Sequence, residues 1–132
     1  MIWCDTNIAK CSWYFGLVTT EAMLHKEMRK MKVPVSMWPR FKQNERSNAV
    51  THFFDNVGLS KEAALVCMAE DKERSGIQIA ALLVHEAVHI WQHHRRSIGE
   101  DNPSAEYEAY GIQSISQSLM GAYQEQTACY KS

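Results

Sequence analysis

Apolar residues along the chain follow two spacings, one typical of strands and the other typical of helices. Three short segments are rich in aromatic, β-branched or small apolar residues, which predicts strands, and three longer segments carry apolar residues three and four positions apart, which predicts helices. The expected strands are residues 12–19, 49–54 and 63–69, and the expected helices are residues 21–31, 77–95 and 105–123. This order predicts an α+β fold in which the helices lie on one face of a small sheet.

Polar and turn-forming residues mark where these elements begin and end. A hydroxyl at Thr19 or Thr20 can cap the first helix, and Ser104 can cap the last helix. Two prolines predict an irregular loop over Val33–Ser47. The turn residues 56–58 separate the second and third strands, which we therefore expect to pair as a hairpin. The helix after the charged turn that ends at Gly76 is expected to be the longest.

The bulk composition limits the classes of protein that fit this chain. Its 132 residues, 45% of them hydrophobic, suit one domain (1–132), in which an N-terminal part (1–48) precedes a core (49–132). A net charge of −1 gives no overall field that would attract nucleic acid or an anionic membrane. No segment reaches the roughly 18 apolar residues of a membrane span, and the N-terminus lacks the pattern of a secretory signal. We therefore expect a cytoplasmic protein that binds neither nucleic acid nor membranes.

The four cysteines fit a reducing compartment, and none of them forms a C-x-x-C pair. Cys67 lies within an apolar run and is expected to be a buried thiol. A disulfide between Cys4 and either Cys11 or Cys129 remains open as an alternative.

The strongest chemical signal is the run His85-Glu86-Ala87-Val88-His89, inside the helix predicted at 77–95. Residues four apart lie one turn above each other on a helix, so His85 and His89 can bind one metal ion from the same side. Glu86 lies beside the first histidine, where it can act on a water molecule at the metal. A catalytic zinc ion takes three protein ligands and keeps a fourth position open. The sequence therefore predicts a zinc site whose third ligand comes from another element.

The helix predicted at 105–123 offers two acidic candidates for that ligand, Glu106 and Glu108, because a short connection returns its first turn toward the histidines. Helical phase places Glu108 nearer the centre of the apolar stripe, whereas Glu106 lies with Tyr110 on a flanking polar strip. A metal ligand can lie at either edge of a buried face, so the spacing alone leaves both open.

The residues around the histidines resemble the zincin metallopeptidases, which carry uncharged residues around and between them. The matching residues here are Leu83, Val84, Ala87, Val88, Ile90 and Trp91. The run 106–110 (Glu-Tyr-Glu-Ala-Tyr) is similar to the E-[FY]-x-A-[DE] pattern of the gluzincins within that clan. The resemblance implies a zincin-like fold, with Glu106 as the third zinc ligand and Tyr110 in place of the acid that orients a ligand histidine. It also implies that the strand 51–54 is the edge strand along which an extended peptide substrate lies.

The same region resembles small proteins encoded by tailed bacteriophages, which combine HEAVHIWQ with a later E-x-E-A-Y-x-I-Q pattern. The matching residues are Ile79–Gln92, Gly99, Glu100, Pro103, Ser104, Glu106, Glu108–Tyr110, Ile112 and Gln113. The resemblance implies a phage protein that acts in the host cytoplasm or is associated with the virion. Its expected partners are a polypeptide substrate or phage structural proteins.

The favoured function is that of a zinc-dependent peptidase with Glu86 as general base, which takes a proton from the attacking water and returns it to the leaving amine. Tyr110, His52 and His93 are candidate donors to the oxygen that becomes negative, and the sequence places none of them. The alternative is a virion or tail-assembly component that keeps the zincin fold and its zinc without proteolysis, because 132 residues leave little chain for a second subdomain. A third hypothesis is an effector that sequesters or cleaves one host protein.

Overall fold

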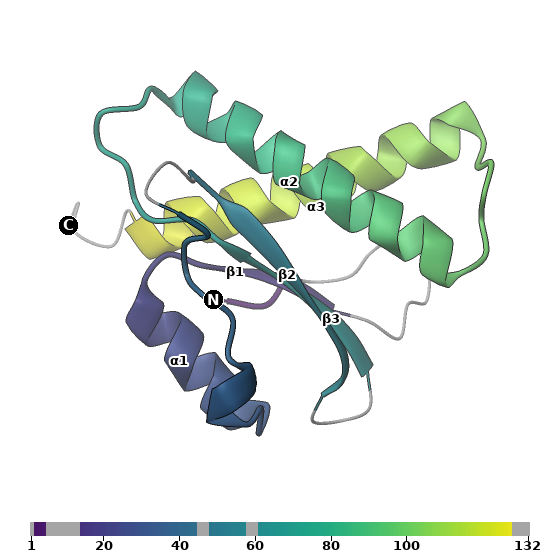
Figure 1. Ribbon diagram of the computed structural model, residues 1–132. Coiled ribbons are helices and arrows are strands. Elements are labelled where there is room, and N and C mark those ends of the chain that lie inside the picture. Colours follow the sequence, from purple (N-terminus) through teal and green to yellow (C-terminus); the bar gives the residue numbers. More distant parts are fainter. Residues whose placement is uncertain (1, 5–13, 45–47, 58–60, 128–132) are drawn as a thin grey trace.

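The computed structural model of the chain describes residues 2–4, 14–44, 48–57 and 61–127 (Figure 1). Within these residues the chain forms three strands, three α-helices and one short 3-10 helix. In chain order they are β1 (Tyr14–Val18), α1 (Glu21–Lys30), η1 (Val35–Met37), β2 (Val50–Val57), β3 (Lys61–Cys67), α2 (Gly76–Ser97) and α3 (Ala105–Thr127). The predicted α+β class and the predicted order of strands and helices are confirmed.

The central strand of the sheet is β3, in the order β1–β3–β2. β1 pairs with it in parallel and β2 pairs with it antiparallel, which confirms the predicted hairpin. The turn predicted at 56–58 is wrong for its first two residues, since β2 continues through Val57. The register shifts between Phe54 and Val57, and an irregularity of this kind lets a strand continue past polar residues. Residue 58 lies outside the described residues.

The outer edge of β1 is covered by a short segment at residues 2–4 (Figure 1). The Leu17 N–H donates to the carbonyl oxygen of Ile2 over 2.9 Å. This approach depends on Gly16, because a Cβ atom there would lie 2.4 Å from the same carbonyl oxygen. In the described part of the chain, the edge of the sheet that remains open is therefore the outer edge of β2.

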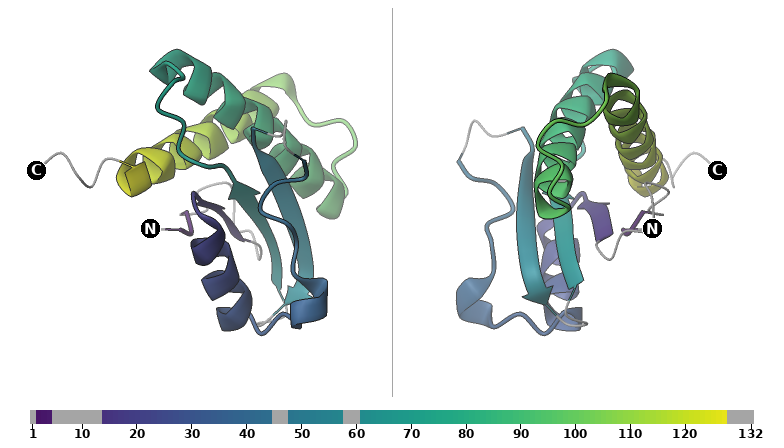
Figure 2. Two further views of the ribbon diagram at one scale, coloured as in Figure 1. Left: turned by 60° about the vertical axis from the view of Figure 1, so that its left-hand side comes forward. Right: turned by 90° about the vertical axis from the view of Figure 1, so that its right-hand side faces the viewer.

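The sheet is covered on both faces, so the expectation that the helices share one face is wrong. α2 and α3 lie on one face of the sheet and α1 lies on the other (Figure 2). Alternate side chains of β1 and β3 pack on opposite faces, one set in the core with α2 and α3 and the other in the core with α1. The first set is Phe15, Leu17, Ala64 and Val66, and the second set is Val18, Leu65 and Cys67. The physical reason is the composition of β3, whose unbroken apolar run leaves apolar side chains to be buried on both faces.

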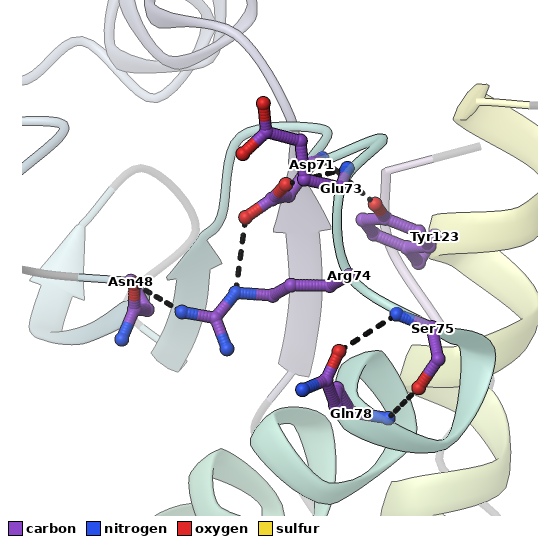
Figure 3. Close-up of polar contacts among 7 residues, drawn as sticks. All are labelled: Asn48, Asp71, Glu73, Arg74, Ser75, Gln78 and Tyr123. Carbon is purple, nitrogen blue, oxygen red and sulfur yellow. Dashed lines mark hydrogen bonds and ion pairs between the residues drawn. The ribbon is translucent and has the colours of Figure 1, made fainter.

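Polar side chains cap the N-termini of the three α-helices. Thr20 and Ser104 accept hydrogen bonds from the first turns of α1 and α3, as the sequence predicts. Ser75 and Gln78 cap α2 reciprocally, so that this helix begins one residue earlier than expected (Figure 3). α3 continues to Thr127, and its 23 residues exceed the 22 of α2, so the expectation that α2 is the longest helix is wrong.

The connection between β3 and α2 is held by a small polar network (Figure 3). Arg74 Nε donates to Asp71 Oδ2 over 3.0 Å, and Arg74 Nη2 donates to Asn48 Oδ1 over 2.8 Å. The backbone N–H of Asp71 donates to the Tyr123 hydroxyl over 3.2 Å. These bonds link the connection to the start of β2 and to α3, and so fix the point from which α2 departs.

α2 and α3 approach closely where Trp91 meets Gly111. Trp91 is fully buried, and a Cβ atom at residue 111 would lie 2.4 Å from its ring. The ring of Tyr107 meets the Trp91 ring edge to face, with 5.2 Å between the ring centroids. The absence of a side chain at residue 111 therefore sets how α3 lies on α2.

The described part of the predicted irregular loop, residues 33–44, contains η1 and is otherwise irregular. Its Trp38 and Phe41 side chains pack against the α1 side of the sheet, away from α2. None of the described helices is long and apolar enough to cross a membrane.

Candidate metal centre

α2 places His85 and His89 one turn apart on its exposed side. The buried side of the helix includes Leu83, Ala87 and Ile90, which pack into the core. The His85 side chain is 68% exposed. The Nε2 atoms of the two histidines lie 3.2 Å apart, with their ring planes at 76° to each other. The predicted pairing of these two side chains is thus present in the structure.

The separation of the two nitrogen atoms fits two ligands of one zinc ion. Zn–N bonds of about 2.0–2.1 Å at a tetrahedral angle hold two nitrogens about 3.3 Å apart. Without a metal, the same distance fits a hydrogen bond in which one ring donates its Nε2–H to the other. The separation of the two nitrogens is therefore compatible both with a shared metal ion and with a direct hydrogen bond between the rings.

Glu86 lies beside the histidine pair but on the buried side of α2, where it is only 6% exposed. Its Oε1 accepts a hydrogen bond from Thr51 Oγ1 on β2 over 2.8 Å. Its Oε2 lies 4.0 Å from Nε2 of His85. A buried carboxylate needs a donor because burial penalises its charge, and the hydroxyl of Thr51 is such a donor. One carboxylate oxygen is therefore anchored on the sheet while the other lies near the histidines.

β2 makes a second contact with α2 two residues further along. Phe53 stacks on His93, with 4.2 Å between the ring centroids. Thr51 and Phe53 lie on the same face of the strand because side chains alternate along it. β2, an edge strand of the sheet, therefore lies against the helix that carries the histidines, and its use by a peptide substrate stays a prediction.

α3 places the two candidate acids differently. Glu108 is half-buried, and its Oε2 accepts a hydrogen bond from Trp91 Nε1 over 3.0 Å. Glu106 is exposed, and so is Tyr110, at 65%. The prediction from helical phase, that Glu108 lies nearer the buried stripe, is confirmed.

Within the described ranges, no group of three or more His, Cys, Asp or Glu side chains is close enough to hold a metal ion. No hydrogen bond or ring contact joins Glu106 or Tyr110 to His85 or His89 in that part of the chain. The structure thus brings the two histidines together with Glu86 beside them, and it leaves Glu106 and Tyr110 apart from them. The two histidines fit two ligands of a zinc ion, and among the described residues no third protein ligand joins them.

Two further histidines, His52 and His94, have contacts other than the histidine pair. His52 Nε2 donates to the carbonyl oxygen of Arg40 over 2.7 Å, on the side of β2 opposite Thr51, so it does not face the pair. Burial lowers the pKa of His52, although the bond to that carbonyl opposes the shift. His94 is buried near Trp91, and burial, followed by the charge of His93, lowers its pKa.

Cys67 is buried, as the sequence predicts, and burial raises the pKa of its thiol to about 12. The alternative disulfides of Cys4 involve residues 11 or 129, which lie outside the described residues.

The residue that sequence reasoning missed is Thr51. The sequence identifies Thr51 only as one residue of a predicted strand. Its contact with Glu86 depends on how that strand packs on α2. The period of two along β2 offers a partial signal, since it puts the hydroxyl on the same face as Phe53.

Comparisons of this chain with protein-family models, with curated proteins and with solved structures find no match. The geometry of the site and the sequence motifs are therefore the observations from which a function can be inferred.

Proposed function

We propose that the protein is a zincin-like, zinc-dependent peptidase of phage origin, in which His85 and His89 hold the metal and Glu86 is the general base. The observation that carries the proposal is the 3.2 Å separation of the two Nε2 atoms on one exposed helix face. Glu86 Oε2, 4.0 Å from Nε2 of His85, puts a carboxylate oxygen beside the same face. The resemblance of the sequence to zincins and to small phage proteins supports the same function.

Zinc bound by the two histidines supplies a Lewis acid that lowers the pKa of a water molecule toward about 7. Glu86 takes a proton from the attacking water at Oε2, while its Oε1 remains bonded to Thr51. It then gives that proton to the leaving amine. The open edge of β2 beside this carboxylate is where an extended peptide can add as a further strand.

Glu106 is the proposed third ligand, and the contacts of α3 support this choice over Glu108. The half-buried Glu108 carboxylate is held at Oε2 by the Trp91 indole N–H, so moving it toward the exposed histidines would strain or break a bond to a buried donor. Glu106 is exposed, so its carboxylate can turn to a metal without that cost.

The experiment that tests the function compares wild-type protein with Glu86→Gln and with Glu100→Gln, an exposed acid outside the site. Each zinc-loaded protein is incubated with unfolded polypeptides, and new chain ends are counted by mass spectrometry. Wild type and Glu100→Gln should cleave, whereas Glu86→Gln should lose about 10²–10⁴-fold in rate and keep its zinc. Equal cleavage by Glu86→Gln and wild type would reject Glu86 as the base.

A structural zinc protein, such as a virion or tail-assembly component, is the second candidate. The specific observation in its favour is that no third metal-binding side chain joins the exposed pair among the described residues. Under this hypothesis zinc binds and no variant cleaves, so the same experiment separates the two functions.

A further inference from the structure

The hydroxyl group of Thr51 forms a hydrogen bond with Glu86. Because of this bond, the two oxygens of the Glu86 carboxylate have different surroundings. Oε1 accepts from Thr51 Oγ1 over 2.8 Å, and Oε2 lies 4.0 Å from Nε2 of His85. A carboxylate with one oxygen held cannot rotate freely about its last bond. One oxygen is therefore held on the strand, and the other is left near the histidine pair.

The strand that carries Thr51 is itself held against α2. Phe53, two residues along the same face of β2, stacks on His93 with 4.2 Å between ring centroids. β2 is also bonded along its inner edge to β3, with Thr51 opposite Val66. The hydroxyl is therefore attached to a rigid element rather than to a loop.

We propose that Thr51 is the positioning residue of the site, which holds Glu86 so that Oε2 is the oxygen that accepts the proton. The proposal rests on the peptidase function for its kinetic consequence, but not for the contact itself. Thr51 transfers no proton: its hydroxyl donates one hydrogen bond to Oε1 throughout, while the proton from water travels to Oε2 and then to the leaving amine.

Two substitutions separate this role from simple packing. Thr51→Val keeps the volume and the β-branch but removes the hydroxyl, whereas Thr51→Ser removes the methyl group and keeps the hydroxyl. A displaced general base slows the chemical step without changing how substrate binds. We therefore expect kcat to fall about 10–100-fold in Thr51→Val with little change in KM, and Thr51→Ser to restore most of kcat.

The contact can be measured without activity by a double-mutant cycle on unfolding of the metal-free protein. Glu86→Met removes both carboxylate oxygens and keeps an unbranched side chain. Thr51→Val should raise the unfolding equilibrium constant about tenfold or more when Glu86 is present. The same substitution should change it much less in the Glu86→Met background, because there is then no carboxylate to hold.

The outcomes for the two proposals are distinct. A nonadditive cycle together with a loss of kcat that Thr51→Ser repairs supports the positioning role. An additive cycle, or a Thr51→Val protein with wild-type kcat, overturns it. A nonadditive cycle in a wild-type protein that cleaves nothing rejects the peptidase function and still supports Thr51 as the group that orients Glu86.

Discussion

The contact between Trp91 and Gly111 sets the distance between α2 and α3, and it can be tested by placing a methyl group between them. In Gly111→Ala the new Cβ would lie 2.4 and 2.6 Å from two ring carbons of Trp91. Favourable contacts between carbon atoms begin at about 3.5 Å, so the overlap is about 1 Å. Trp91 is fully buried and has little room to move. One of the two helices must therefore shift.

The matched control is Gly121→Ala, because residue 121 lies in the same helix and a Cβ there meets nothing within 4 Å. Replacing glycine by alanine within a helix stabilises it by about 1 kcal/mol, and both variants share this gain. Overpacking a core costs about 1–3 kcal/mol and sometimes more. We expect Gly121→Ala to raise the free energy of unfolding by about 0.5–1 kcal/mol, and Gly111→Ala to lie about 2–3 kcal/mol below it.

Equilibrium unfolding in urea measures both values, provided that the slope of the transition is unchanged between variants. The metal-free protein is used, so that zinc binding does not contribute to stability. If Gly111→Ala were as stable as Gly121→Ala, Trp91 would not lie against residue 111, and the packing of α3 on α2 described above would be wrong.

Three further predictions concern the interior and the third ligand. Cys67, buried and with a thiol pKa of about 12, should resist iodoacetamide at pH 8 in the folded protein and react in urea, as peptide mapping will show; rapid labelling of the folded protein would contradict its burial. Burial lowers the pKa of His94 in the folded state, so as the pH falls below about 6.5 the unfolded chain takes up the proton before the folded one. The free energy of unfolding should therefore decline from pH 7 toward pH 5, and it should decline less in His94→Asn. An equal decline in both would show that His94 does not contribute. Glu106→Gln should weaken zinc binding, measured by competition with a chelator, by about tenfold or more, whereas Glu108→Gln should change it little; the reverse order would make Glu108 the ligand.

Local patterns in the sequence predict most of the elements. The apolar spacing identifies the strands and helices within a few residues, and the hydroxyls of Thr20 and Ser104 mark helix starts that the structure confirms. These features depend on neighbours close in the chain. The side of the sheet taken by α1 could not be read in this way, because the unbroken apolar run of β3 gives no polar face to identify.

In the candidate site, too, the features set by neighbours in the chain could be predicted, and those set by tertiary packing could not. His85 and His89 face the same way because a helix places residues four apart on one side, and the sequence alone is enough for that. The contact of Thr51 with Glu86 depends on the approach of a strand to a helix 35 residues away, which periodicity does not contain. The position of Glu106 likewise depends on how Gly111 lets α3 lie on α2.

The metal content of the purified protein, measured by elemental mass spectrometry, tests most directly whether His85 and His89 hold a zinc ion. Wild type is compared with the His85→Ala/His89→Ala double variant after both are supplied with zinc and dialysed. We expect about one zinc per chain in wild type and almost none in the double variant. A wild-type protein that holds no zinc, or a double variant that holds as much as wild type, would contradict this expectation.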